Sequence, residues 1–197
     1  MKSEGFTVWF TGLPCSGKST LSRLLQKLLS ENDLPVEILD GDEARQKLPK
    51  DLGFSKQDRD DNVRRIAYVA KLLIRVGAVA IVSLVSPYRA TREHVRKEIE
   101  RFVQIHVRCP LELHTKRDVK GQYVKALKRA IQNFTGISDP YEPPINPEIV
   151  IDTDQNSPEE CLKNIHDKLV SFNYLRDQLV CINSTPEQPV PQLLQAR

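Results

Sequence analysis

Residues 12–19 read GLPCSGKS and come directly after the apolar run FTVWF at 6–10. Glycines at both ends of this segment let backbone N–H groups curl around an anion, while Lys18 supplies a cation and Ser19 supplies a hydroxyl ligand for Mg²⁺. Residues 20–29 carry apolar side chains at helical spacing, so a strand, a glycine-rich loop and a helix follow one another. This order constrains the chain to a fold that binds the phosphates of ATP or GTP. A plain glycine turn between strand and helix is the alternative.

Short apolar runs recur along the whole chain, separated by segments with mostly helical periodicity. Alternation of this kind predicts an α/β fold with a parallel sheet. The expected strands are Phe6–Phe10, Val36–Leu39, Ala78–Val85, Phe102–Val107 and Glu148–Ile151.

Two long helices are expected from the spacing of apolar residues. The first runs from Gln57 to Arg75, with Ser55 as its N-cap and Gly77 just past its end. The second runs from Pro158 to about Val180, because proline suits the first helical turn and an apolar stripe continues along the segment. The members of that stripe are Cys161, Leu162, Ile165, Leu169, Phe172 and Leu175.

Length and composition indicate one ordinary domain. At 197 residues the chain can bury roughly 70% of its unfolded surface without disulfides or metals. We expect this domain over residues 1–181 and a loosely ordered, proline-containing tail over 182–197. The net charge of +3 is too small to argue for a nucleic-acid partner. The four cysteines, Cys15, Cys109, Cys161 and Cys181, form no CxxC pair, so neither a zinc site nor a disulfide framework is expected.

The same sequence predicts a cytoplasmic protein without a membrane partner. A strand begins almost at once after the N-terminus, which leaves no room for a signal peptide. No apolar stretch approaches the ~20 residues that span a bilayer.

Polar residues follow two of the expected strands. Asp40 and Asp42 flank Gly41 after the second apolar run, and Ser86 ends the third. Ligands of open parallel sheets bind beyond the carboxyl ends of the strands, so these side chains are site candidates. Since the third run contains no acid, the two aspartates are the candidate metal-side carboxylates, and one of them could act as a base. An ordinary turn remains the alternative for both segments.

The start of the 57–75 helix and the segment 117–141 are both highly charged. Arg59 and Asn62 lie three residues apart on one helix face, where a guanidinium and an amide could grip an anionic group. A solvated face is the usual alternative. The segment from Arg117 to Tyr141 is rich in Lys and Arg, which favours a basic flap that closes over a nucleotide and excludes water. An exposed basic helix without a catalytic role is the other interpretation.

Taken together, these motifs resemble the adenylylsulfate kinase family, whose members phosphorylate the 3′-hydroxyl of adenosine 5′-phosphosulfate (APS) to make PAPS in sulfate assimilation. The resemblance covers about Phe6 to Leu169. It implies a three-layer P-loop kinase fold, with a central parallel sheet of about five strands and helices on both faces. It also implies ATP as co-substrate, Mg²⁺ as cofactor and a homodimer. The motifs that carry it are GLPCSGKST, LDGDEAR, LGFSKQDRDDNVRRIA, VSPYR, RDVKGQY and FTGISDPYEPP, in the family's order.

The resemblance assigns roles on the donor side. Lys18 would contact the transferring group, Ser19 would bind Mg²⁺, and Arg117 and Lys120 would contact ATP. The positions that would hold the ATP phosphates are Gly12, Leu13, Pro14, Cys15, Ser16, Gly17, Lys18, Ser19 and Thr20.

On the acceptor side the resemblance implies that Asp42 orients or deprotonates the 3′-hydroxyl, with Asp40 on the metal side. Phe54 and Phe134 would sandwich the adenine of APS, because stacking grips a flat base at low entropic cost. The catalytic candidates are Lys18, Asp40, Asp42 and Ser86, and the APS-binding candidates are Asp42, Arg45, Phe54, Arg59, Asn62, Ser86 and Phe134.

The sequence departs from the family pattern in two places. Thr91 precedes Arg92 where the family often has an aspartate, and Gln132 stands where the family commonly has a lysine that faces the substrate. Losing that cation would weaken APS binding by roughly 1.5–3 kcal/mol unless Lys128 or Arg129 replaces it. Two alternatives therefore stay open: a kinase of a related nucleotide other than APS, and a nucleotide-binding regulatory subunit without activity.

Overall fold

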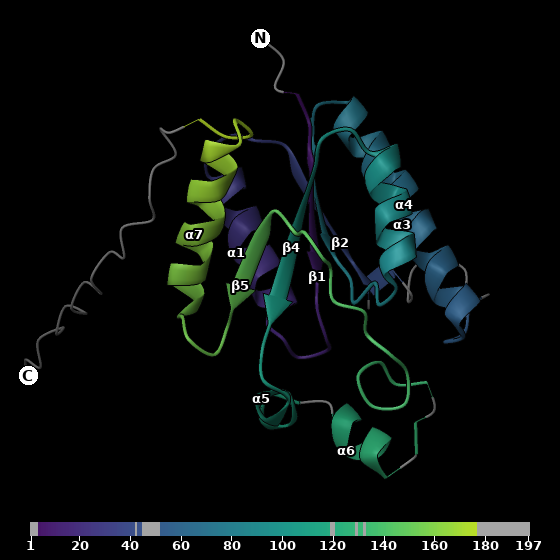
Figure 1. Cartoon of the computed structure of the whole chain (residues 1–197). Helices are drawn as coiled ribbons and strands as arrows, with labels where there is room; N and C mark the ends of the chain where they lie inside the picture. Colours follow the sequence, from purple (N-terminus) through teal and green to yellow (C-terminus); the bar gives the residue numbers. More distant parts are fainter. Residues whose placement is uncertain are drawn as a thin grey trace, which may run out of the picture.

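The computed structural model describes residues 4–41, 43–44, 52–118, 121–128, 130–131 and 133–176. A fully parallel sheet runs through its centre in the order β2-β3-β1-β4-β5. Helices cover both faces, α1 and α7 on one side and α3 and α4 on the other (Figure 1). The expected three-layer α/β fold is confirmed. The strands are β1 (Thr7–Thr11), β2 (Val36–Asp40), β3 (Val79–Ser83), β4 (Phe102–Arg108) and β5 (Ile149–Asp152).

The helices connect these strands and extend beyond them. The short helices α5 and α6 lie past the carboxyl end of β4, away from the two main helical layers (Figure 1). Their position places part of the predicted basic flap next to the edge of the sheet where parallel strands present their ligand sites. The helices are α1 (Lys18–Ser30), α3 (Lys56–Arg75), α4 (Arg89–Glu98), α5 (Leu111–Lys116), α6 (Gln122–Leu127) and α7 (Pro158–Ser171).

The sheet forms because its central strands bury both faces, and this explains their continuous apolar runs. Every residue of β1 and β3 is buried. One core cluster packs Phe10, Ile105 and Leu25 between the sheet and α1, and a second packs Trp9 and Ile66 beneath α3. The expected third strand, Ala78–Val85, is too long at both ends. Leu84 and Val85 leave the strand and extend toward the site described below.

Helix α3 begins one residue before its expected start and ends at the expected residue. Ser55 caps it in a reciprocal capping box with Asp58, as the sequence predicts for an N-cap serine. Just past the C-terminus, Gly77 adopts the left-handed conformation with φ of 90°. The helix therefore presents its polar first turns at the edge of the sheet where the strands end.

The expected extension of the last helix to about Val180 is wrong. Helix α7 ends at Ser171 because Asn173 adopts the left-handed conformation, with φ of 59°. The N–H of Tyr174 donates to the carbonyl of Leu169 at 2.9 Å and closes the helix in a Schellman-type turn. Leu175 still packs in the core from this turn, whereas Phe172 is 39% exposed instead of forming part of the buried stripe.

The remaining expectations about organisation concern residues outside the described ranges. The predicted tail, 182–197, and Cys181 lie there. Among the described cysteines, Cys15, Cys109 and Cys161 take part in no disulfide. None of the helices in the described ranges is long and apolar enough to cross a membrane.

His106 on β4 should make the fold sensitive to acid. Burial, together with the nearby Arg108 and Arg92, lowers its pKa from 6.5 to about 4. Below pH 6.5 the unfolded chain therefore takes up a proton that the folded chain refuses, so stability is lost as the pH falls from about 6.5 to about 4. The shift sets an upper limit of about 3 kcal/mol for this contribution.

Urea unfolding at pH 7 and pH 4.5 measures the acid effect. The native protein should lose more unfolding free energy between these pH values than the variant His106→Gln, whose side chain does not titrate. An equal loss in both proteins would assign the acid sensitivity to other groups.

Candidate active site

One cavity of about 830 Å³ opens at the carboxyl edge of the sheet. It brings together residues from the phosphate loop, β2, the start of α3, the segment after β3 and the flap. Residues distant in sequence therefore share one site, as the strand-end argument predicts. The predicted site residues on its walls are Pro14, Cys15, Lys18, Ser19, Asp40, Phe54, Arg59, Asn62, Ser86, Arg117 and Phe134.

The other predicted site residues divide into two groups. Some belong to the phosphate loop but do not line the cavity: Gly12, Leu13, Ser16, Gly17 and Thr20. Others lie outside the described residues: Asp42, Arg45 and Lys120, as do Arg129 and Gln132, where the sequence departs from the family pattern.

The phosphate loop wraps closely around the ammonium group of Lys18. The Lys18 Nζ donates to the carbonyls of Gly12 at 2.9 Å and Leu13 at 2.7 Å. Gly12 itself has no room for a side chain, because an added Cβ would lie 2.4 Å from the carbonyl oxygen of Val107. Gly17, with φ of 102°, adopts a backbone conformation that favours glycine. The loop thus holds a cation at the start of α1, where a phosphate can compete for it.

Ser19 and Asp40 form the oxygen-rich corner of the cavity. The Ser19 hydroxyl donates to Asp40 Oδ2 at 3.1 Å, which joins the first turn of α1 to the end of β2. In the described ranges no group of three or more His, Cys, Asp or Glu side chains could hold a metal ion. A hydroxyl and a carboxylate nevertheless fit Mg²⁺, which prefers hard oxygen ligands and usually keeps several waters beside one or two protein carboxylates and substrate phosphates.

On the donor side, Arg117 contacts a residue that the sequence did not indicate. Its guanidinium donates to the hydroxyl and the carbonyl of Thr153, both at 2.9 Å. The Thr153 hydroxyl in turn donates to the carbonyl of Ser16 in the phosphate loop, also at 2.9 Å. Thr153 immediately follows β5, so its position at a strand end was the available signal.

On the acceptor side, Arg59 ties the two predicted aromatic residues together. Its Nε donates to the carbonyl of Phe54 at 3.1 Å, and its guanidinium lies 5.7 Å from the centre of the Phe54 ring. Another guanidinium nitrogen donates to the carbonyl of Asn133, next to Phe134, and Asp139 lies 3.7 Å away. Phe54 is 58% exposed and Phe134 only 8%. One aromatic wall of the cavity is therefore open to solvent and the other is packed in the flap.

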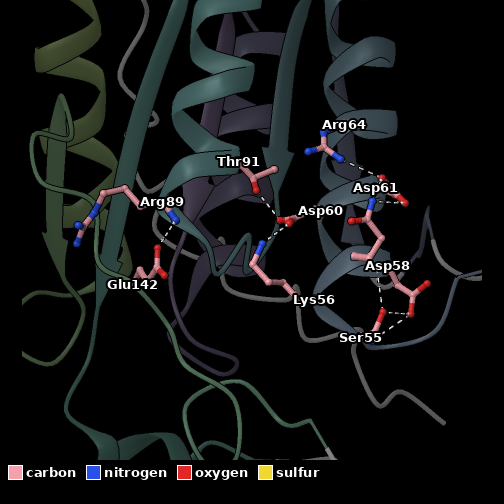
Figure 2. A network of polar contacts seen from close by, with 10 residues as sticks. Ser55, Lys56, Asp58, Asp60, Asp61, Arg64, Arg89, Thr91 and Glu142 are labelled. Carbon is pink, nitrogen blue, oxygen red and sulfur yellow. Dashed lines mark hydrogen bonds and ion pairs between the residues drawn. The ribbon is translucent and has the colours of Figure 1, made fainter.

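The network at the start of α3 accounts for the unusual Thr91. The Thr91 hydroxyl donates to Asp60, and Lys56 Nζ donates to the same carboxylate at 2.7 Å (Figure 2). The hydrogen bond to Asp60 also raises the pKa of Lys56. Asp60 and Asn62 are both buried although the helix start is highly charged. This part of α3 is therefore packed against α4 and is not a fully solvated face.

Arg92, the neighbour of Thr91, is a structural residue. Its guanidinium donates to the carbonyls of Ser86 and Glu142, and it lies 5.7 Å from the centre of the Tyr141 ring. Its side chain is almost completely buried. Arg92 therefore joins the segment after β3 to the end of the flap without needing an aspartate at position 91.

The Ser86 hydroxyl is also engaged within the protein. It accepts a hydrogen bond from Trp9 Nε1 at 3.1 Å and donates to the Thr11 hydroxyl at 3.1 Å. Ser86 has a positive φ of 38°, so the chain turns sharply here at the cavity wall. These contacts favour a structural role for the hydroxyl, and its contact with an acceptor stays a prediction.

The phosphate loop between β1 and α1, the parallel sheet and the shared cavity define the protein as a P-loop kinase in fold. A solved shikimate kinase from Aquifex aeolicus has the same fold, with a TM-score of 0.51 at 17% identity, covering 85% of this chain and 98% of that chain. A family model described as adenylylsulphate kinase matches residues 4–152. The chain belongs to the adenylylsulphate kinase family.

Relatives and solved structures agree with this assignment. The chain is 52% identical to an adenylyl-sulfate kinase of Synechococcus sp. (strain JA-3-3Ab) over 176 residues, covering 89% of this chain and all of the relative. It is 52% identical to an adenylyl-sulfate kinase of Chloroflexus aurantiacus, covering 82% and 87% of the two chains. The structure of the Mycobacterium tuberculosis APS kinase CysC in complex with AMPPNP and APS matches with a TM-score of 0.81 and 40% identity, over 85% of this chain and 98% of that one.

Proposed function

We propose that the protein transfers the γ-phosphoryl group of ATP to the 3′-hydroxyl of APS, giving ADP and PAPS. The observation that carries this proposal is the shared cavity, whose walls include the Lys18 end of the phosphate loop and the Phe54, Arg59 and Phe134 group. A site with a phosphate-binding loop at one side and an aromatic and cationic pocket at the other suits two nucleotides. The solved relative with AMPPNP and APS supports the same pair of ligands.

Catalysis in this site would depend on position and charge. Phosphoryl transfer accumulates negative charge on oxygens and needs the attacking and leaving oxygens in line. Lys18 would neutralise charge on the transferring group, and Arg59 would hold the anionic end of the acceptor. Asp42, by resemblance, would orient or deprotonate the 3′-hydroxyl, and Ser86 would support the acceptor wall.

Ser19 and Asp40 are the residues that would hold Mg²⁺. Their oxygens lie 3.1 Å apart at the cavity wall. When bound, Mg²⁺ would offset the negative charge of the ATP phosphates. The ATP subsite would include the phosphate loop, Arg117 and Lys120, and Thr153 would support it from the end of β5.

A coupled assay tests the proposed reaction. We expect purified protein with Mg-ATP to release ADP only when APS is added, and chromatography to show PAPS in equal amount. A parallel assay in which AMP replaces APS tests whether the sulfate group is required, because the two nucleotides share the same adenosine. ADP release with another nucleotide but not with APS would establish the alternative acceptor. ATP binding without transfer to any acceptor would establish a regulatory subunit.

We also propose that the protein is a cytoplasmic homodimer. The resemblance to the family supports the dimer, and the widely spaced cysteines suit a reducing compartment. Light scattering of the purified chain would distinguish a dimer from the 22.5 kDa monomer.

A further inference from the structure

The carbonyl of Pro14 in the phosphate loop accepts two hydrogen bonds from side chains of α5 and α6. His114 Nδ1 lies 2.6 Å from this oxygen, and the Tyr123 hydroxyl lies 3.1 Å from it. These residues come from α5 and α6, 100 and 109 positions along the chain from Pro14. Both side chains are almost completely buried, with exposed fractions of 1% and 0%. Two buried donors thus converge on one carbonyl of the loop.

These contacts fix the orientation of one peptide plane. A trans peptide is planar, and its C=O and N–H point in opposite directions. The structure contains no cis peptide among the residues it describes. Holding the Pro14 carbonyl toward α5 and α6 therefore turns the N–H of Cys15 the other way. Successive backbone N–H groups of such loops are the groups that bind phosphate.

The peptide needs this support because its neighbour has an unfavourable backbone conformation. Cys15 has φ of 60°, a left-handed value that residues other than glycine seldom adopt. Residues in such regions keep their conformation only when surrounding contacts hold them there. The two hydrogen bonds to Pro14 are contacts of that kind.

Both ring nitrogens of His114 face carbonyl oxygens. Its Nε2 lies 3.0 Å from the carbonyl of Cys109, just after β4. Because an imidazole with a single N–H can donate to only one of two carbonyls, the shorter contact, 2.6 Å to Pro14, assigns this N–H to Nδ1. The ring also stacks on Tyr123, with centroids 5.7 Å apart. The imidazole therefore connects the end of a central strand to the phosphate loop in one fixed orientation.

Tyr123 extends the connection to Phe134, which by resemblance would bind the adenine of APS. Its ring meets Phe134 edge to face, with centroids 4.9 Å apart. Burial raises the pKa of its hydroxyl, so the group stays protonated and able to donate to Pro14. The contacts run without interruption from Pro14 through Tyr123 to Phe134.

We propose that His114 is a positioning residue, which acts with Tyr123 to set the Pro14–Cys15 peptide for the phosphates of ATP. The two side chains touch the loop rather than the reacting atoms, so their effect reaches the nucleotide through the loop backbone. The proposal rests on the proposed function only in taking ATP as the ligand of the loop. According to this proposal, the affinity for ATP depends on a hydrogen-bond donor at the position of His114 Nδ1.

Replacing His114 by asparagine or by glutamine tests its contacts with Pro14 and Cys109 separately. His114→Asn keeps an N–H donor near the place of Nδ1, which faces Pro14, whereas His114→Gln reaches the place of Nε2, which faces Cys109. We expect His114→Gln to raise the Kd for Mg-AMPPNP about tenfold, and His114→Asn to stay within about threefold of the native protein. Tyr123→Phe, which keeps the ring, should raise the Kd by about threefold to fivefold.

Calorimetry with Mg-AMPPNP gives the Kd values, and steady-state kinetics gives KM for each substrate. The KM for ATP should follow the Kd, while kcat and the KM for APS stay within about twofold of native. Glu112→Gln, on the exposed side of α5, is the matched control and should bind as the native protein does.

Equal Kd values for His114→Asn and His114→Gln would overturn the proposal, because packing alone would then explain both. So would a loss confined to the KM for APS. Melting curves of all variants show whether a loss of affinity follows a loss of folding. The binding measurement contains no acceptor, so a protein that binds AMPPNP but does not phosphorylate APS would refute the proposed reaction and leave this test intact.

Discussion

Lys18→Ala is expected to lower kcat/KM for phosphoryl transfer by about 10³-fold or more. The ammonium group is buried at the start of α1, where it donates to the carbonyls of Gly12 and Leu13. A cation held in a site with little water is worth far more to a developing negative charge than one in solvent. Its removal also leaves two loop carbonyls without their donor, which disfavours the loop conformation that receives the phosphates.

Initial rates of ADP release with saturating APS measure this effect. Lys27→Ala is the matched control, because Lys27 lies on the same helix, is 60% exposed and pairs only loosely with Glu31 at 3.8 Å. That control should keep the native rate within about twofold, as expected for an exposed ion pair. If Lys18→Ala kept more than about a tenth of the native kcat/KM while remaining folded, charge neutralisation by this residue would not be the main source of catalysis.

The phosphate loop and the sheet could be predicted because their determinants are local. The glycines, the lysine and the flanking apolar runs of the phosphate loop occur within one short segment. Parallel strands that are buried on both faces have continuous apolar sequences, which can be recognised one strand at a time. The order of the strands in the sheet and the packing of Phe134 in the flap depend on contacts between distant segments. Both features are visible only in the folded structure.

The end of α7 could not be predicted from apolar periodicity, because a polar residue determines where this helix ends. The apolar stripe of α7 continues to Leu175, and periodicity alone therefore carried the expected helix too far. Asn173 ends it by adopting the left-handed conformation, and Leu175 reaches the core from the turn instead. Periodicity shows which residues are buried, but it does not show which turn brings them there.

The supporting residues of the site were the least predictable. His114 and Thr153 contact the phosphate loop from 100 and 137 positions away along the chain, and neither belongs to a motif with ligand spacing. Thr91 departs from the family pattern, yet its hydroxyl satisfies Asp60, a buried acid on another helix. Such pairs are visible only when the fold brings two helices or loops together.

Arg59→Ala should raise the KM for APS about 100-fold while changing the KM for ATP by less than about threefold. The guanidinium joins Phe54 to the flap at Asn133 and Asp139, in the wall of the cavity. Its loss would therefore remove a cation for the acceptor and, at the same time, release the two aromatic walls from each other. Arg59→Lys should recover only part of the effect, because an ammonium group lacks the planar fork that reaches two acceptors.

Arg64 provides the matched control for this prediction. It lies on the same helix and has the same charge, but it is 48% exposed and pairs with Asp61 at 3.0 Å on the outer surface (Figure 2). Arg64→Ala should leave both KM values within about twofold, because an exposed pair contributes little. If Arg59→Ala and Arg64→Ala changed the KM for APS equally, the effect would come from the overall charge of α3. A selective loss in Arg59→Ala, with ATP use preserved, would locate the acceptor between Phe54 and the flap, because Arg59 contacts both, whereas the ion pair of Arg64 is with Asp61 on its own helix.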